Sequence, residues 1–146
     1  MTSIPIERLN YLCTHIPNLL AAIDEATFNE KTSPAKWSKK EIVGHLIDSA
    51  TNNHQRFIRA QFEDRPSITY DQNNWNKYNF YHEIDKQQII DFWAVYNKQL
   101  LELIKRIPKE SLKRECQVGN QYLTLEFLVN DYVVHLEHHL KQIVSY

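Results

Sequence analysis

Histidines are the residues of this sequence best suited to chemistry. There are seven, and three of them are His135, His138 and His139. Residues four apart in an α-helix lie about 40° apart around the axis and about 6 Å along it. His135 and His139 can therefore reach one metal ion from one helical face. His138 is the competing partner for His135, but we favour His139 because the 135/139 stripe extends to Asp131 and Gln142.

Two histidines rarely complete a catalytic metal site, which commonly has three protein ligands and further positions for water or substrate. The best third candidate is His45, because it lies in a helical pattern with Ile42, Leu46 and Ile47 and partly faces the core. Polar residues continue its stripe and predict a wet pocket: Asp48, Ser49, Asn52 and Arg56. Such histidines also occur as hydrogen-bonded core or surface residues, so spacing alone leaves both interpretations open.

Composition places the chain among ordinary globular proteins. It has 146 residues, 42% of them hydrophobic, which fits a single domain, residues 1–146, with a real core. Only two glycines are present, which favours helices over turn-rich β-structure. The net charge of −1, without a basic stripe, argues against a nucleic-acid partner. No apolar run is long enough to span a bilayer, and no signal peptide is evident.

Two isolated cysteines, Cys13 and Cys116, form neither a disulfide framework nor a CxxC zinc pair. We expect a cytoplasmic protein in which both thiols are reduced and structural. A homodimer is an assembly that such bundles often form.

Apolar residues recur at helical spacing in four long segments. The first runs from Ile6 to about Phe28, and Pro17 should kink or split it near Ile16. The second begins with a capping box, Ser38 to Glu41, and should end at about Glu63. The third is expected at about 84–107, and the last should be capped by Thr124 and extend to about Ile143.

Two connectors lack this pattern. The segment 65–82 is rich in asparagine and aromatic residues, and so long a loop is often functional. The segment 109–119 suggests only a short helical turn at 110–113. Four long helices with a few extra turns predict a four-helix bundle, either with an extra short helix or with a kinked first helix.

Two stretches carry a family resemblance. WSKKEIVGHLIDSA (37–50) and DYVVHLEHHLKQI (131–143) resemble the signatures of the DinB-like superfamily, which includes the YfiT-type proteins. The resemblance covers nearly the whole chain. It implies an all-α four-helix bundle of DinB/YfiT type, with one divalent ion, nickel, zinc, manganese or iron, held by His45, His135 and His139. Similar proteins include thiol S-transferases and metal-dependent hydrolases, so a small-molecule substrate is implied.

The chemistry of such a site depends on whether a base lies beside the metal. An ion held by three neutral imidazoles lowers the pKa of a bound thiol or water. The sequence HLEHH lacks the glutamate of HExxH, and Glu137 should face elsewhere. Asp48 and Asp131 are the acids one turn from a ligand, and either could orient a histidine or act as a base.

The missing base favours a transferase that acts on a low-molecular-weight thiol. The alternatives are a metal-dependent hydrolase and a non-enzymatic metal-binding bundle. Asn52 and Arg56 are candidates to bind a carboxylate of the thiol, although a surface salt bridge is the simpler role for the arginine. Trp75 and Tyr78, in the long loop, are candidates to close over the pocket, or else pack as an ordinary cap.

Overall fold

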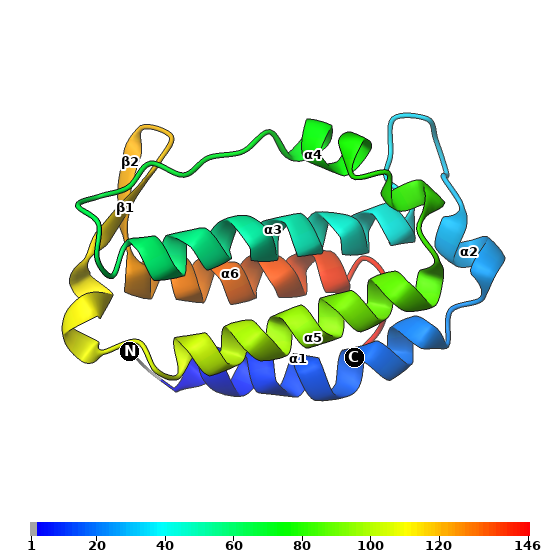
Figure 1. Cartoon of the computed structure of the whole chain (residues 1–146). Coiled ribbons are helices and arrows are strands. Elements are labelled where there is room, and N and C mark those ends of the chain that lie inside the picture. Colours follow the sequence, from blue (N-terminus) through cyan, green and yellow to red (C-terminus); the bar gives the residue numbers. More distant parts are fainter. Residues whose placement is uncertain (1–2) are drawn as a thin grey trace.

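Four long helices dominate the computed structural model, which describes residues 3–146 (Figure 1). They are α1 (Ile4–Ala21), α3 (Lys39–Arg59), α5 (Lys86–Ile104) and α6 (Leu125–Leu140). Short elements join them: α2 (Glu25–Asn29), α4 (Gln72–Tyr78), the 3-10 turns η1 (Tyr81–Glu83) and η2 (Lys109–Lys113), and the strands β1 (Glu115–Val118) and β2 (Gln121–Thr124). The predicted helical bundle with an extra short helix is confirmed.

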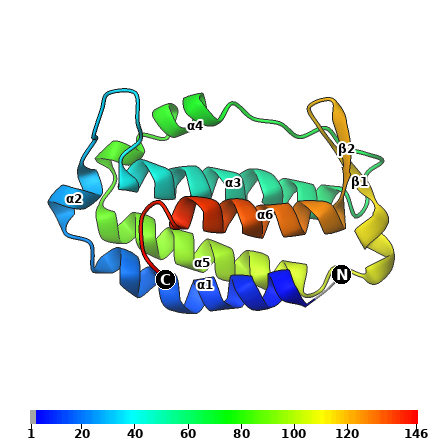
Figure 2. The same ribbon diagram turned by 180° about the vertical axis from the view of Figure 1, so that it is seen from behind.

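The four helices form a bundle in which α1 and α3 occupy opposite corners, since each packs beside both α5 and α6. Figures 1 and 2 show that α3 and α5 run in the same direction, whereas α6 runs antiparallel to α3. The connection from α3 to α5 must therefore return along about 30 Å of helix. Residues 60–85, which we call the crossover, make this return and lie over α3 (Figure 1).

The first predicted helix does break, but not at the proline. Helix α1 continues through Pro17 to Ala21, so the expected split near Ile16 is wrong. The chain leaves the helix at 22–24, where Asp24 begins α2 by accepting a hydrogen bond from the backbone N–H of Thr27 at 2.8 Å. A proline removes only one helical hydrogen bond, whereas the aspartate actively stabilises a new helix start.

The start of α3 forms as predicted. Ser38 Oγ accepts from the N–H of Glu41 at 3.1 Å, and the Glu41 carboxylate accepts from the N–H of Ser38 at 3.0 Å. This capping box fixes the first turn of the helix that carries His45. The regular helix ends at Arg59, four residues before the predicted end, and turns carry the chain onward.

Both connectors contain structure that the sequence pattern did not predict. The segment 65–82 holds α4, which Asp71 caps by accepting from the N–H of Asn74 at 3.1 Å. In the segment 109–119 the short helical turn is present as η2, but it is followed by a β-hairpin. Gly119 turns the hairpin with φ +62°, a conformation that glycine adopts at little cost.

The hairpin also holds one end of the crossover. Ile68 N–H donates to Gln117 O at 3.1 Å, and Gln117 N–H donates to Pro66 O at 2.9 Å. The crossover is thus fixed beside β1 before it runs along α3. Among residues 3–146, no helix combines the length and apolar character needed to cross a membrane.

Gly44 lets the crossover approach α3 closely. A Cβ atom built at Gly44 would lie 2.3 Å from ring atoms of Tyr81, which is buried. Only a residue without a side chain permits this contact, and the contact brings the Tyr81 hydroxyl to Asp48 at 2.6 Å. The glycine beside His45 therefore sets the position of the crossover over the helix.

We expect Gly44→Ala to destabilise the protein by about 1–3 kcal/mol, because overpacking outweighs the better helix propensity of alanine. Urea unfolding of the variant measures this loss. Gln55→Ala, at an exposed position of the same helix, is the matched control and should unfold close to wild type. Equal midpoints for Gly44→Ala and wild type would contradict the close approach of Tyr81.

Candidate metal centre

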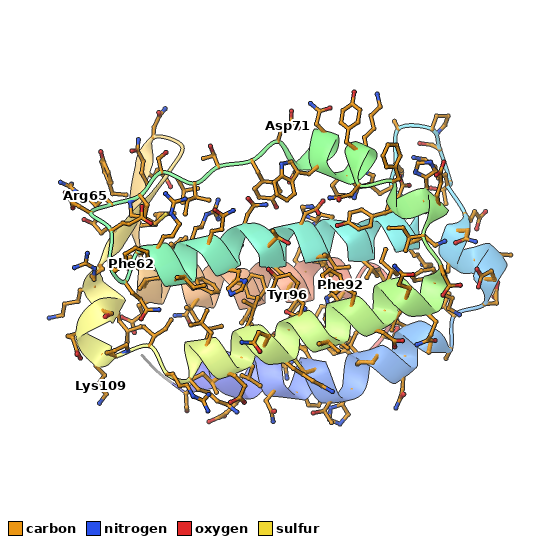
Figure 3. The ribbon with its side chains drawn as sticks, in the orientation of Figure 1. Phe62, Arg65, Asp71, Phe92, Tyr96 and Lys109 are labelled. Atoms are coloured by element: carbon orange, nitrogen blue, oxygen red, sulfur yellow. The ribbon has the colours of Figure 1, made fainter. Side chains whose placement is uncertain are left out.

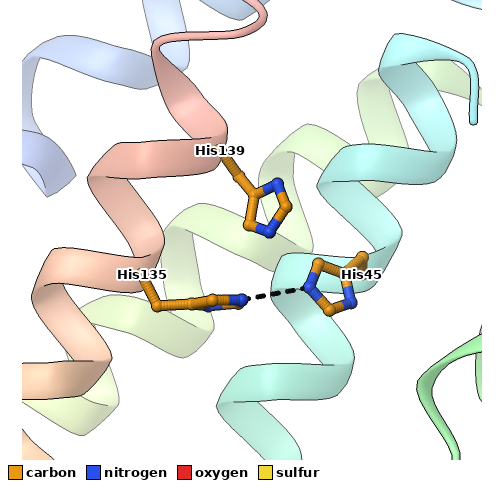
Figure 4. Close-up of side chains that lie close together, drawn as sticks. All are labelled: His45, His135 and His139. Carbon is orange, nitrogen blue, oxygen red and sulfur yellow. Dashed lines mark hydrogen bonds between the residues drawn. The ribbon is translucent and has the colours of Figure 1, made fainter.

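Helix α6 presents His135 and His139 one turn apart. The helix begins at Thr124, whose hydroxyl accepts from the N–H of Phe127 at 3.1 Å, as predicted. One face of the same helix packs against the core through its buried apolar residues: Leu128, Val129, Tyr132, Val133, Leu136 and Leu140. The two histidines are half-buried and face α3, so they lie at the edge of the core (Figure 4).

Helix α3 places His45 opposite this pair. His45 is only 1% exposed, and its Nε2 lies 3.2 Å from Nε2 of His135 (Figure 4). The ring of His45 lies 4.8 Å from that of His139, measured between centroids. One nitrogen from each of the three rings lies within 4.8 Å of the others. The structure therefore brings together the three histidines that the sequence singled out.

His138 does not join this group. It is exposed, and its ring packs edge-on against that of His139 at 5.1 Å. His139 is further oriented by Gln142, whose Oε1 lies 3.0 Å from Nδ1 of the ring. Because an amide oxygen only accepts, the proton of His139 sits on Nδ1 and its Nε2 is free to act as a ligand.

All three imidazoles are held in the neutral form. Burial first, and then the charges that His135 and His139 would carry, lower the pKa of His45 to about 3. Burial, followed by the neighbouring His139, lowers the pKa of His135 to about 4. The pKa of His139 is also lowered, mainly by burial. Neutral imidazole is the form that binds a metal, so protons compete weakly for this site near neutral pH.

The chemistry of this donor set fits a metal ion. Nitrogens that share an ion at about 2.1 Å lie within about 4 Å of one another, so small side-chain rotations would complete the set. In the absence of an ion, the contact between His45 and His135 requires one Nε2 to donate a proton to the other. Nδ1 of His45 is buried and has no hydrogen-bond partner within residues 3–146. A ring that binds a metal through Nε2 carries its proton on this atom.

The two candidate acids differ sharply in their surroundings. Asp48, on the next turn of α3, is buried, and its Oδ1 accepts from the Tyr81 hydroxyl at 2.6 Å and from Asn79 at 2.9 Å. Burial raises its pKa to about 6, although both hydrogen bonds act to lower it. Asp131 is exposed, and its charge raises the pKa of His135. In the described chain, neither acid hydrogen-bonds to one of the three histidines.

Arg56 has a different environment from the one expected. It is 9% exposed and makes no ion pair in the described part of the chain, so the prediction of a surface salt bridge is wrong. Its Nε and Nη2 donate to the carbonyl oxygen of Ile68 at 3.2 and 2.9 Å, and Nη1 donates to Asn53 at 3.3 Å. Arg56 therefore anchors the crossover to α3, about 16 Å along the helix axis from His45.

The remaining candidates for the pocket either lie away from the histidines or already bind or pack against other residues. Asn52 is buried and donates to the backbone oxygen of Asp48 at 2.9 Å. Trp75 packs against Tyr70 with 5.5 Å between ring centroids, and Tyr78 is exposed. Trp75 and Tyr78 line a separate surface hollow. The structure does not place them over the metal centre.

A cavity of about 620 Å³ lies near the centre, although none of the three histidines is among its lining residues. Its lining includes Lys36, Trp37, Ile42, Gln72, Asn73 and Gln142. Trp37 connects it to the centre, because its ring lies 4.8 Å from that of His45. Gln142 connects it again through its hydrogen bond to His139. A substrate in this cavity would contact Trp37 and Gln142, the two lining residues that contact the histidines.

The sequence did not predict three of the residues that surround this site. Trp37 was noted only as the first residue of the stretch 37–50, and Gln142 only as an extension of the stripe of His139. The spacing of Gln142, three residues after a histidine, was a usable signal for a side chain that orients the ring. Tyr81 could not be found, because it comes from a segment without periodicity.

Comparison with known proteins places this geometry in a family. Residues 14–143 match the DinB superfamily. YfiT of Bacillus subtilis strain 168, described as a candidate metal-dependent hydrolase, is 24% identical over 133 residues, which cover 87% of this chain and 75% of that protein. The solved YfiT structure, described as a four-helix bundle of unusual topology, aligns with a TM-score of 0.87 at 21% identity and covers 97% of this chain and 82% of that one.

A second fold match is a mycothiol-dependent maleylpyruvate isomerase. It aligns with a TM-score of 0.80 at 11% identity, over 98% of this chain but only 60% of the longer isomerase. At such low identities, the solved structures establish likeness of fold alone. The match to residues 14–143, by contrast, spans most of the sequence and both histidine-bearing segments, and the chain belongs to the DinB superfamily.

Proposed function

We propose that this protein is a metalloenzyme that holds one divalent transition-metal ion through His45, His135 and His139. The observation that carries the proposal is the convergence of three neutral imidazoles from two helices on one point. Imidazole suits nickel, zinc and iron and also occurs with manganese, so the ligand set alone does not select among them. Membership of the DinB superfamily and likeness to a candidate metal-dependent hydrolase support the same proposal.

The reaction we propose is transfer of a low-molecular-weight thiol to a small electrophilic substrate. A bound ion would supply Lewis acidity that lowers the pKa of a thiol or water. Acids near the centre are poorly placed to act as a base for the thiol: Glu137 is paired with Arg8 at 2.5 Å, Asp131 is exposed, and the hydrogen bonds of Asp48 go to Tyr81 and Asn79 rather than to a histidine. A thiol activated in this way needs no general base. The fold match to a mycothiol-dependent enzyme supports thiol chemistry for this chain.

Metal-dependent hydrolysis is the second candidate, and one observation favours it. Asp48 has a pKa raised to about 6 by burial, close to the value at which a carboxylate acts as a base near neutral pH. Its Oδ2 has no hydrogen-bond partner within residues 3–146. Under this alternative, Asp48 would hold and deprotonate the attacking water, while Tyr81 and Asn79 fix its orientation through Oδ1. Assembly as a homodimer stays a prediction.

Metal content tests the shared premise. We expect wild-type protein incubated with zinc and desalted to retain about one ion per chain. His45→Ala, His135→Ala and His139→Ala should each bind zinc at least about 100-fold more weakly, because each removes a direct ligand. Mass spectrometry of the metal measures the occupancy. His138→Ala is the matched control beside the site and should retain its zinc; unchanged occupancy in the other three would refute the ligand set.

The stability of the metal-free protein should fall as the pH drops from about 6.5 to about 4. Unfolded histidines have a pKa near 6.5, whereas folded His45 and His135 have values of about 3 and 4, so the unfolded chain binds more protons in this range. Asp48, with its raised pKa, opposes this trend, but two histidines outweigh one carboxyl. Urea midpoints from pH 7.5 to 4.5 should decline less steeply in His45→Gln/His135→Gln; parallel curves would contradict the neutral folded state.

Asp48→Asn separates the two reactions. Asparagine keeps an acceptor for the Tyr81 hydroxyl but cannot act as a base. We expect zinc-loaded wild type to conjugate a thiol to monochlorobimane, and Asp48→Asn to do so within a few-fold of the same rate. Loss of a general base would instead lower hydrolytic turnover about 10²- to 10⁴-fold. Amide hydrolysis without thiol that disappears in Asp48→Asn but not in Asp131→Asn would establish the hydrolase alternative.

A further inference from the structure

A second cavity adjoins the one lined by Trp37 and Gln142. This second cavity has a volume of about 390 Å³ and shares Trp37 and Asn73 with the first. We call the first the inner lobe, the second the outer lobe, and both together the cleft. The inner lobe is linked to the metal centre by Trp37, whose ring lies against that of His45, and by Gln142, which is hydrogen-bonded to His139. The outer lobe lies farther along the connector between α2 and α3 and against α4, with Lys31, Lys77 and His82 in its lining.

The cleft is positively charged in a protein whose net charge is −1. Lys36 lines the inner lobe, and Lys31 and Lys77 line the outer lobe. Glu41 is the one acid in the two linings, and it is already neutralised. Lys31 lies 3.3 Å from its carboxylate, which also accepts from the N–H of Ser38 and has a lowered pKa.

Two lysines are therefore left without an acidic partner. Within residues 3–146, neither Lys36 nor Lys77 forms an ion pair, and Lys77 lies 5.3 Å from the ring centroid of Tyr78. The rest of the lining is suited to a polar molecule. Gln72, Asn73 and Gln142 offer amide donors and acceptors, while Trp37 supplies a flat apolar surface between the lobes.

We infer that the cleft binds a small organic molecule bearing carboxylates, with its reactive group in the inner lobe at Trp37 and Gln142, the residues that contact the histidines. Lys36 and Lys77 bind the carboxylates, and the amides bind the polar groups between them. This inference rests on the proposed function, because it names the substrate class of the same site. It assigns specificity to residues of the α2–α3 connector and of α4, rather than to Arg56, which the crossover occupies.

Binding of S-methylglutathione tests this inference without using the metal or any thiol. The probe carries two carboxylates, and its sulfur is blocked. Its diethyl ester is nearly the same size but lacks both negative charges. We expect calorimetry on metal-free protein to show binding of the acid that weakens as salt rises, and the ester to bind at least about 10-fold more weakly.

Variants locate the binding in the cleft. Lys36→Ala and Lys77→Ala should each weaken binding of the acid about 10-fold, since each removes a charged hydrogen-bond donor, and neither should change binding of the ester. Lys98→Ala/Lys109→Ala removes two exposed lysines outside the cleft and should leave both affinities unchanged. Figure 3 shows Lys109 at the end of the bundle opposite α2.

The outcomes separate this inference from the proposed function. Equal binding of acid and ester, no binding of the acid, or lysine variants that match wild type would each overturn the cleft assignment. Zinc occupancy of the three histidines would still stand or fall by its own measurement. Charge-dependent binding that is lost in the cleft variants supports the inference even if no thiol is ever conjugated.

Discussion

The burial of α3 is the constraint on which the rest of this structure depends. The helix carries many polar residues, yet the crossover covers it on one side and the bundle on the others, so its polar groups need partners inside the protein. The crossover supplies several of them: Tyr81 and Asn79 bind Asp48, and the carbonyl of Ile68 binds Arg56. The parallel course of α3 and α5 in turn requires a connection of this length.

Burial also determines the protonation of the histidine centre. His45 is buried on α3, while His135 and His139 lie half-buried at the edge of the core on α6, so the three rings are enclosed on one side and partly exposed on the other. Burial lowers the pKa of each ring and removes the competition of protons for the ligand atoms. Trp37 and Gln142 contact these rings and also line a cavity whose other lining residues are partly polar and cationic.

Local signals explain which parts were predictable from sequence. The capping box at Ser38, the cap at Thr124 and the i, i+4 spacing of His135 and His139 are rules within one helix, and the structure follows them. The meeting of His45 with α6 depends on packing between helices, and there the family resemblance was needed. Helix α4, the hairpin and the roles of Tyr81 and Arg56 were missed because short elements and long-range hydrogen bonds leave no periodic pattern. The Gly119–Asn120 pair was an overlooked hairpin signal.

The contact between His45 and His135 joins positions 90 residues apart along the chain. An ion shared by these rings would therefore act as a cross-link that closes a very long loop. Closing such a loop removes much of the conformational freedom of the unfolded chain, as a disulfide does, but reversibly and without cysteines. Resistance to unfolding would then track the free concentration of the ion, so that the availability of metal in the surroundings would govern the lifetime of the protein as well as its chemistry.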